Sequence, residues 1–292
     1  IGVAADQSDN SYHVLVGATG VLIEGFTIRD GHANPPAPTS QDDEAGSKAD
    51  GPYLGPLAAS FLGTYYDVQC GGGIMCLNLS SIVIRNCTFS HSRADYAGGA
   101  LYVRNSGVDL YDCSFTSNVA GSWGGAVFTT AAASVWIEDS LFYSNSAARG
   151  AGAMMSSAGT TVDVESCRFM NNSTSHDGGA ILHNMGGLDI VNSVFYNNTA
   201  QLHGGALLVN DSSVHLTNCT LVENSAWNSG GGIEANDCLL TLANSIVWDN
   251  TAPEAPDVRP RFGTDFYPEY SCLNGAVFTG PGVIHSDPLF VD

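Results

Sequence analysis

Four carboxylates recur at matching positions of a repeated pattern, and paired carboxylates are the groups most able to do chemistry in this chain. Asp163 and Asp189 are 26 residues apart, and Glu138 and Glu165 are 27 residues apart. If successive repeats stack, each pair lies about 5 Å apart, one strand spacing. Such a pair could hydrolyse a glycosidic bond or share a cation. A solvated sheet face that tolerates acids is the simplest interpretation, so we predict no catalytic residue and keep these four only as candidates.

Aromatic and polar side chains accompany the carboxylates on the same predicted face. Trp136 could stack on a sugar ring, and Asp109 and His215 occupy the same repeat position as Trp136. Tyr111 occupies the neighbouring outward position. We therefore predict these four residues as ligand-binding, with a carbohydrate or a protein surface as the partner.

The next strand of each repeat is predicted to expose an apolar stripe. Its members are Leu141, Tyr143, Met170, Val194, Tyr196, Val222, Ile246 and Trp248. Large exposed apolar patches usually mark contacts. We expect a loop of the same chain or another molecule to cover the stripe, and self-association is one form of that coverage.

The elements that position these side chains come from a repeat of 26 or 27 residues. Gly-Gly-Ala followed by an aliphatic residue recurs at 98–101, 124–127, 178–181 and 204–207, with variants at 72–74, 151–154 and 231–233. An alternating strand follows, then a polar corner and a third strand. Stacked units pair each strand with its equivalents and bury one face of all of them. The sequence predicts an all-β fold, a single-stranded right-handed parallel β-helix of about seven to nine rungs with three strands per rung.

Asparagine occupies one position near the last corner of six successive units. The six are Asn118, Asn145, Asn172, Asn198, Asn224 and Asn250. Stacked Asn side chains can bond to the rungs above and below, so we predict a structural ladder at a corner rather than a binding site.

The cysteines indicate a structural role. Cys87, Cys113, Cys167 and Cys219 share one inward position that is Ser in other repeats. Small residues in a stack explain this without redox or metal chemistry. If disulfides form, Cys70 with Cys76 and Cys238 with Cys272 are the better candidates. No ligand spacing for zinc is present.

The chain is predicted to be one domain, and a fragment of a longer chain. We expect first rungs at 1–33, an insertion at 34–69, regular repeats at 70–252 and an irregular C-terminal cap at 253–292 with one or two short strands. The insertion should fold onto the body as a cap or flap, with ligand binding as the alternative. Its acidic residues Asp42, Asp43, Glu44 and Asp50 could hold Ca²⁺, although they lack the spacing of a dedicated loop, and no cofactor is required.

Charge excludes several classes of function. The formal net charge of −20, with only nine Lys and Arg, opposes binding to nucleic acid or to anionic membranes. No apolar run approaches the ~20 residues that span a bilayer, so we expect no membrane insertion by this segment. The few Arg are spread over different corners, which disfavours an enzyme that cleaves acidic sugars and needs cations at its site.

The repeat resembles that of polymorphic outer membrane proteins, in which Gly-Gly-Ala-[Ile/Leu/Val] combines with Phe-x-x-Asn. The chain matches Phe-x-x-Asn at Phe115/Asn118, Phe142/Asn145, Phe169/Asn172 and Phe195/Asn198. It departs from this motif at Phe89/Ser92, Leu221/Asn224 and Val247/Asn250. The resemblance covers roughly residues 71–252. More broadly, residues 12–14, 24–28 and 287–290 are similar to secreted bacterial β-helix proteins of the pectin-lyase-like superfamily.

These resemblances imply an extracellular or bacterial cell-surface location and adhesive use, without a fixed catalytic set. The function predicted is a non-enzymatic surface module for adhesion, for carbohydrate or partner binding, or for surface assembly. The alternative is a polysaccharide-acting enzyme, a glycoside hydrolase, lyase or epimerase, as pectin-lyase-like proteins often are.

Overall fold

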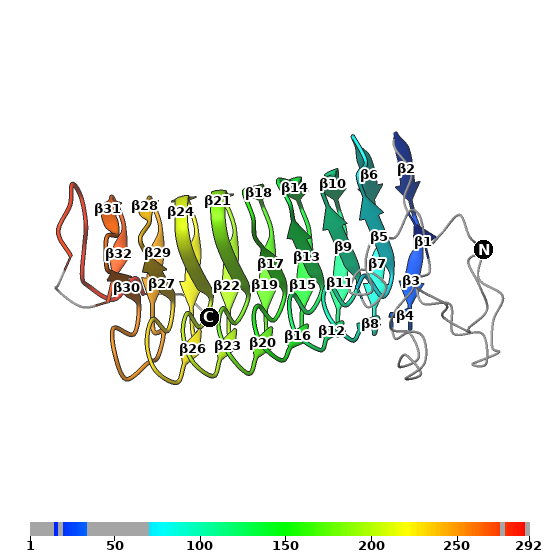
Figure 1. Ribbon diagram of the computed structural model, residues 1–292. Helices are drawn as coiled ribbons and strands as arrows, with labels where there is room; N and C mark the ends of the chain where they lie inside the picture. Colours follow the sequence, from blue (N-terminus) through cyan, green and yellow to red (C-terminus); the bar gives the residue numbers. More distant parts are fainter. Residues whose placement is uncertain (1–14, 17–19, 34–69, 275–277, 290–292) are drawn as a thin grey trace.

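The computed structural model describes residues 15–16, 20–33, 70–274 and 278–289. Every regular element in this part of the chain is a β-strand, and all strand pairs are parallel. The rungs stack along one axis, with β2 and β3 near one end and β31 and β32 near the other (Figure 1). The predicted all-β solenoid with three strands per rung is confirmed, and seven of the described rungs add a further pair of residues that forms a short fourth strand.

Strands at equivalent places in successive rungs form four series. The first strands are β1 (Leu15–Val16), β5 (Ile74–Leu77), β9 (Leu101–Arg104), β13 (Val127–Thr130), β17 (Met154–Ser156), β27 (Ile233–Asn236) and β30 (Val258–Arg261). The second strands are β2 (Val21–Glu24), β6 (Ile82–Arg85), β10 (Gly107–Tyr111), β14 (Ser134–Glu138), β18 (Thr160–Glu165), β28 (Leu239–Ala243) and β31 (Asp265–Glu269). Two long strands run through both places, β21 (Ile181–Val191) and β24 (Leu207–Thr217).

The remaining series close each rung. The third strands are β3 (Thr27–Arg29), β7 (Thr88–Ser90), β11 (Ser114–Thr116), β15 (Leu141–Tyr143), β19 (Arg168–Met170), β22 (Val194–Tyr196), β25 (Thr220–Val222), β29 (Ile246–Trp248) and β32 (Cys272–Leu273). The short strands are β4 (His32–Ala33), β8 (Arg93–Ala94), β12 (Val119–Ala120), β16 (Ser146–Ala147), β20 (Ser173–Thr174), β23 (Thr199–Ala200) and β26 (Ser225–Ala226). First and second strands belong to one sheet because β21 and β24 join them, and the third and short strands form two further sheets.

The corners explain why the chain is so rich in Asn, Asp and Ser. A residue with positive φ follows each described second strand, as at Asn192 (φ 53°) and Asn218 (φ 55°). Another follows most of the third strands, as at Asn171 (φ 57°). Asn and Asp tolerate this left-handed conformation better than other residues that carry a side chain. Many of the Asn residues are therefore corner residues, distinct from the ladder.

The paired glycines serve two different needs. Gly124 has φ +61°, a conformation that glycine adopts without strain. At Gly125 the limit is space, since a Cβ would stand 2.1 Å from the carbonyl oxygen of Gly152 in the next rung. The Gly-Gly repeat thus follows from the close stacking of the rungs.

Stacked side chains fill the interior. Five fully buried phenylalanines, Phe89, Phe115, Phe142, Phe169 and Phe195, form a column with neighbouring ring centroids 4.6–4.8 Å apart. This spacing matches the distance between neighbouring strands, so each ring packs on the ring of the next rung.

The six predicted ladder asparagines stand in one buried column. In each step the side-chain amide nitrogen of one Asn donates to the Oδ1 of the next, at 3.0 Å from Asn118 to Asn145 and 2.9 Å from Asn224 to Asn250. The same oxygen also accepts the backbone N–H of the preceding Asn. At the C-terminal end Asp257 takes the place of a seventh Asn, because its Oδ1 accepts from Asn250 Nδ2 at 2.9 Å.

All eight cysteines are buried free thiols, so the two candidate disulfides are wrong. Cys238 directly precedes β28 and Cys272 begins β32, which belongs to a different sheet, and each thiol donates to a backbone carbonyl instead. In the stacked position the thiol or hydroxyl of one rung accepts the backbone N–H of another, as Ser193 Oγ does for Cys167 at 3.0 Å. The Ser/Cys alternation is therefore a hydrogen-bonded column, as the pattern of small residues indicated.

Regular pairing extends further than the sequence predicted. β2 pairs with β6, so the first rung is stacked directly on the rung that follows the 34–69 insertion. At the other end β30, β31 and β32 continue the register through Leu273, past residue 252 where an irregular cap with one or two strands was expected. The insertion itself, with its acidic candidates, lies outside the described residues.

Candidate functional site

The second strands carry the predicted chemical face. Strand pairing aligns Asp109, Trp136, Asp163, Asp189 and His215 in one column, each in register with the next. All of them point outward from the solenoid, and Asp189 is the most exposed of the five. The sequence-derived column is therefore present as a continuous strip across β10, β14, β18, β21 and β24.

Trp136 is held in place within this strip. Its indole Nε1 donates to Glu138 Oε2 at 3.1 Å, and its strand partners on either side are Asp109 and Asp163. One position along, Tyr111 is in register with Glu138 and lies under the guanidinium of Arg85, whose Cζ is 5.1 Å from the ring centroid. Trp136 and Tyr111 are thus two aromatic side chains on adjacent strands, each in register with a carboxylate of the other strand.

Two acids on this face, Asp163 and Asp109, have raised pKa values. Burial and the neighbouring charge of Asp189 raise the pKa of Asp163, and burial raises the pKa of Asp109. Glu138 and Glu165 are also in register on adjacent strands. The paired carboxylates are thus brought together as predicted.

His215 is engaged with its neighbours. Its Nδ1 lies 2.7 Å from Thr241 Oγ1, and its Nε2 lies 3.2 Å from Ser213 Oγ. The imidazole therefore ends the acidic part of the column in a hydrogen-bonded array of hydroxyl groups.

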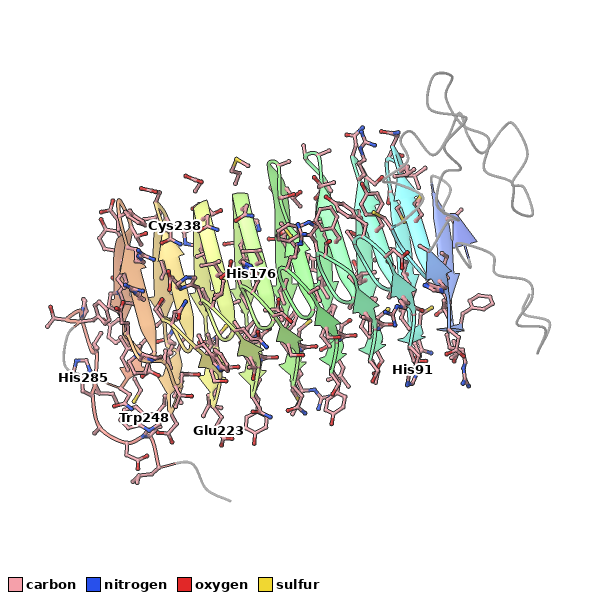
Figure 2. All side chains as sticks on the ribbon, turned by 60° about the horizontal axis from the view of Figure 1, so that its bottom comes forward. His91, His176, Glu223, Cys238, Trp248 and His285 are labelled. Carbon is pink, nitrogen blue, oxygen red and sulfur yellow. The ribbon has the colours of Figure 1, made fainter. Side chains whose placement is uncertain are left out.

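The third strands display the predicted apolar stripe in two columns. Tyr143, Met170, Tyr196, Val222 and Trp248 follow one another in register. In the second column the predicted Leu141, Val194 and Ile246 are separated by two polar residues, the exposed cation Arg168 and then Thr220, which the sequence prediction left out. This half of the stripe is therefore not continuous. Figure 2 shows Trp248 on the same edge of the solenoid as the corner residues Glu223 and His91.

A third surface, not foreseen from the sequence, lies over the first strands in the C-terminal half. A groove of about 570 Å³ is bounded by the turns that precede β21 and β24 and by the corners that follow the first strands. Its lining is polar with apolar spots: Asp177, Asn184, Met185, His203, Leu208, Asn210, Asp211, Glu234, Asn236, Asp237, Arg261 and Phe262.

A family model described as a right-handed β-helix region matches residues 72–247, more than half of the chain. The chain belongs to the right-handed β-helix family. Searches among curated proteins and among solved structures gave no match. The family fixes the fold and its hand, and the site must be argued from the residues of this β-helix.

The groove of this β-helix contains the most buried carboxylate among the residues that the structure describes. Glu234 is 1% exposed, at a place where the preceding rungs have Leu182 and Leu208. Its Oε1 accepts from Arg261 at 3.1 Å, and its Oε2 accepts from the Ser229 hydroxyl and lies 3.3 Å from His203 Nδ1. In the sequence, the only signal was that Glu234 replaces the aliphatic residue found at this place in the two preceding repeats. The general pattern of the first strands does not single out this change.

This Ser, His and Glu set is not arranged for nucleophilic catalysis. Ser229 is fully buried, and its hydroxyl donates directly to Glu234. His203 uses the same nitrogen, Nδ1, toward both Ser229 and Glu234, whereas a triad needs opposite ring nitrogens for these contacts. The cluster fixes the wall of the groove.

Two further observations concern metals and membranes. No group of three or more potential ligands able to hold a metal ion occurs within the described ranges. Among those residues there is also no helix long and apolar enough to cross a membrane.

Proposed function

We propose that this β-helix is a non-enzymatic extracellular or cell-surface module that binds carbohydrate or a protein surface through its second-strand face. The observation that carries the proposal is the fixed orientation of Trp136 between Asp109 and Asp163. An aromatic ring flanked by carboxylates offers a sugar both a stacking surface and hydrogen-bond acceptors.

The location is supported by sequence rather than by geometry. The resemblance to polymorphic outer membrane and pectin-lyase-like proteins favours a surface or secreted protein with an adhesive role. The net charge of −20 keeps an elongated molecule soluble and disfavours anionic partners. Calcium could bridge acidic residues to a ligand, so Ca²⁺ belongs in the test.

A glycan array probed with and without Ca²⁺ tests the proposal. Trp136→Ala should abolish binding to the glycans that the unmodified chain retains. Trp227→Ala is the matched control, because Trp227 is 73% exposed at a corner outside this face. Equal loss in both variants, or no glycan and no protein partner retained, would contradict a binding face centred on Trp136.

A polysaccharide-acting enzyme is the second candidate. It is favoured by one observation, the raised pKa of Asp163 next to the in-register Asp189, which is how a general acid and its partner are often arranged. Product analysis on any retained glycan decides between the two functions. Turnover that disappears in Asp163→Asn would show that the protein is an enzyme rather than a binding module.

The apolar stripe supports a further part of the proposal, self-association through the third strands. Tyr143 and Trp248 lie at opposite ends of its continuous column, so a second copy could pack along several rungs. Sedimentation velocity of the unmodified chain and of Tyr196→Ser should show a dimer only in the former. A monomer at all concentrations would contradict self-association, and the stripe would then be covered by the 34–69 insertion or by another partner.

A further inference from the structure

We propose that the groove over the first strands binds an extended segment of another protein, in which apolar residues flank two basic ones. The groove lies over the first strands rather than the second strands, so the inference does not depend on the proposed function. It rests on the exposed side chains along one rim of the groove, on the size of the groove and on its unpaired negative charge.

The groove opens where an outer cover of the first strands ends. In the N-terminal half Tyr96 and Trp123 pack against an apolar cluster on the outside of these strands. The Trp123 ring reaches over the next rung, where a Cβ on Gly150 would be 2.8 Å from it. Farther along, the places equivalent to Trp123 hold Asp177 and His203, which are polar and line the groove.

One rim of the groove is a single column of corner residues. Met185, Asp211, Asp237 and Phe262 stand at the same corner of four successive rungs, because the residues that precede them are paired in register. All four line the groove and are exposed. The order along this rim is therefore apolar, acidic, acidic, apolar, and a complementary segment would be apolar, basic, basic, apolar.

The two apolar residues of the rim offer contact surface at either end. Met185 is 52% exposed and Phe262 is 76% exposed. The Phe262 ring is held by the Arg261 guanidinium, with Cζ 4.7 Å from the ring centroid, and Arg261 is in turn fixed by its bond to buried Glu234. Exposed apolar side chains at both ends of a groove would lose their contact with water against apolar side chains of a partner.

The size of the groove selects an extended chain. From Met185 to Phe262 the rim covers three rung steps, about 14 Å, which is the length of about four extended residues. A volume of about 570 Å³ spread over about 14 Å gives an average cross-section of about 40 Å². An α-helix with its side chains is about 10–12 Å across, so its cross-section is roughly twice as large.

The charge of the groove favours a basic partner. The guanidinium of Arg261 is paired with Glu234, so these two charges offset each other. Asp211 and Asp237 make no ion pair with any residue that the structure describes, and the carboxylate of Asp237 accepts only the backbone N–H of Gly263, at 3.1 Å. Like charges on adjacent strands repel each other, and basic side chains between them would remove this repulsion.

A pair of acids without the groove serves as the comparison. Asp112 and Asp139 also stand on adjacent rungs, at the corner that follows the second strands, and both are exposed with positive φ. Their neighbours in that column are Asn86 and Ser166, so no apolar residue flanks them there. This pair has the charge of the rim without its apolar ends, and we expect it not to bind the same segment.

Fluorescence anisotropy with the labelled peptide Gly-Leu-Arg-Arg-Leu-Gly tests the proposal on the whole chain. The peptide should bind, and its affinity should fall as the salt concentration is raised. Asp211→Asn combined with Asp237→Asn should weaken binding about tenfold. Asp112→Asn combined with Asp139→Asn changes the net charge equally and should change the affinity less than about twofold. Asn tolerates the positive φ at all four positions, so both double variants should keep the thermal melting curve of the unmodified chain.

Two altered peptides separate the charge from the apolar contacts. Citrulline in place of both arginines removes the charge, and glycine in place of both leucines removes the apolar side chains. Each should bind more weakly than the first peptide. Phe262→Asn should weaken binding of the leucine peptide and leave that of the glycine peptide unchanged, since only the former contacts the ring.

Several outcomes would overturn the inference. They are no binding of the leucine peptide, equal weakening by the two double variants, or equal affinity for the citrulline peptide. Equal affinity for the glycine peptide, or displacement of the leucine peptide by an equal concentration of spermidine, would show that any small oligocation suffices and that the apolar ends contribute nothing. Binding that is lost only in the Asp112 and Asp139 double variant would place the peptide near the second strands instead of in the groove.

Discussion

The histidine inside the solenoid makes stability depend on pH in a way that can be worked out. His183 is fully buried on β21, with Nδ1 2.5 Å from Ser156 Oγ, and burial lowers its pKa from 6.5 to about 4. The unfolded chain therefore takes up this proton near pH 6.5, whereas the folded chain resists it until about pH 4. The stabilising effect of neutral His183 is complete above pH 6.5 and is lost as the pH falls toward 4. At ~1.4 kcal/mol per pKa unit, the full loss is about 3 kcal/mol.

Asp257 has the opposite sign. Burial is the main cause that raises its pKa from 3.8 to about 6, against the hydrogen bonds that it accepts from Asn250 and Asn274. The folded chain thus binds this proton more tightly than the unfolded chain. Stability rises as the pH falls from about 6 to 3.8, again by about 3 kcal/mol. The two buried groups nearly cancel between pH 6.5 and 4.

Two substitutions separate these contributions. Relative to the unmodified chain, His183→Val should gain stability as the pH falls from 7 to 4.5, and Asp257→Asn should lose it. Valine is a suitable replacement because Val209 is the partner of His183 in the next rung. Urea denaturation followed by circular dichroism at several pH values gives the two slopes. If His183→Val shows the same pH dependence as the unmodified chain, His183 is not a buried neutral base and the reasoning fails.

Three further predictions concern the stacking of rungs. Asn172→Ala removes four hydrogen bonds, two to Asn145, one to the Phe142 carbonyl and one to the next ladder residue, and should lower the free energy of unfolding by about 4 kcal/mol in urea titrations. Phe142→Ala empties a fully buried place between two stacked rings and should cost about 3–5 kcal/mol by the same measurement. Gly125→Ala places a Cβ 2.1 Å from a backbone oxygen of the next rung and should prevent native folding, as seen by circular dichroism. Gly159→Ala, with open space around the new Cβ, should fold and lose only about 1 kcal/mol.

The repeat made the columns predictable from sequence. Once units of 26 or 27 residues are aligned, the pairing of Trp136 with Asp163 and the succession of ladder asparagines follow, because parallel stacking keeps equivalent positions in register. The same reasoning identified the stripe on the third strands, although it omitted Arg168, which departs from the apolar rule within its own column.

Other features depend on contacts that a repeat alignment does not show. The groove arises from the loss of an outer cover near Trp123 and from the change of Leu208 to Glu234, and both lie on the face of the first strands that the Gly-Gly-Ala pattern leaves undefined. The candidate disulfides failed for a related reason. Cys238 and Cys272 lie near the same end of the chain, but they adjoin strands of different sheets, so their thiols do not meet.

The exchange of Asn for Asp at the end of the buried ladder has a consequence for how long the ladder can be. Every amide in the ladder accepts a hydrogen bond through its oxygen and donates one through its nitrogen, and all of them point the same way along the axis. The ionised carboxylate of Asp257 accepts a hydrogen bond but has no hydrogen to donate. Its other oxygen, Oδ2, accepts the backbone N–H of Asn274 at 2.9 Å, so the segment that follows meets Asp257 with a backbone donor and not with another amide side chain. The exchange of one amide for a carboxylate therefore ends the row of amides at Asp257 and fixes its direction.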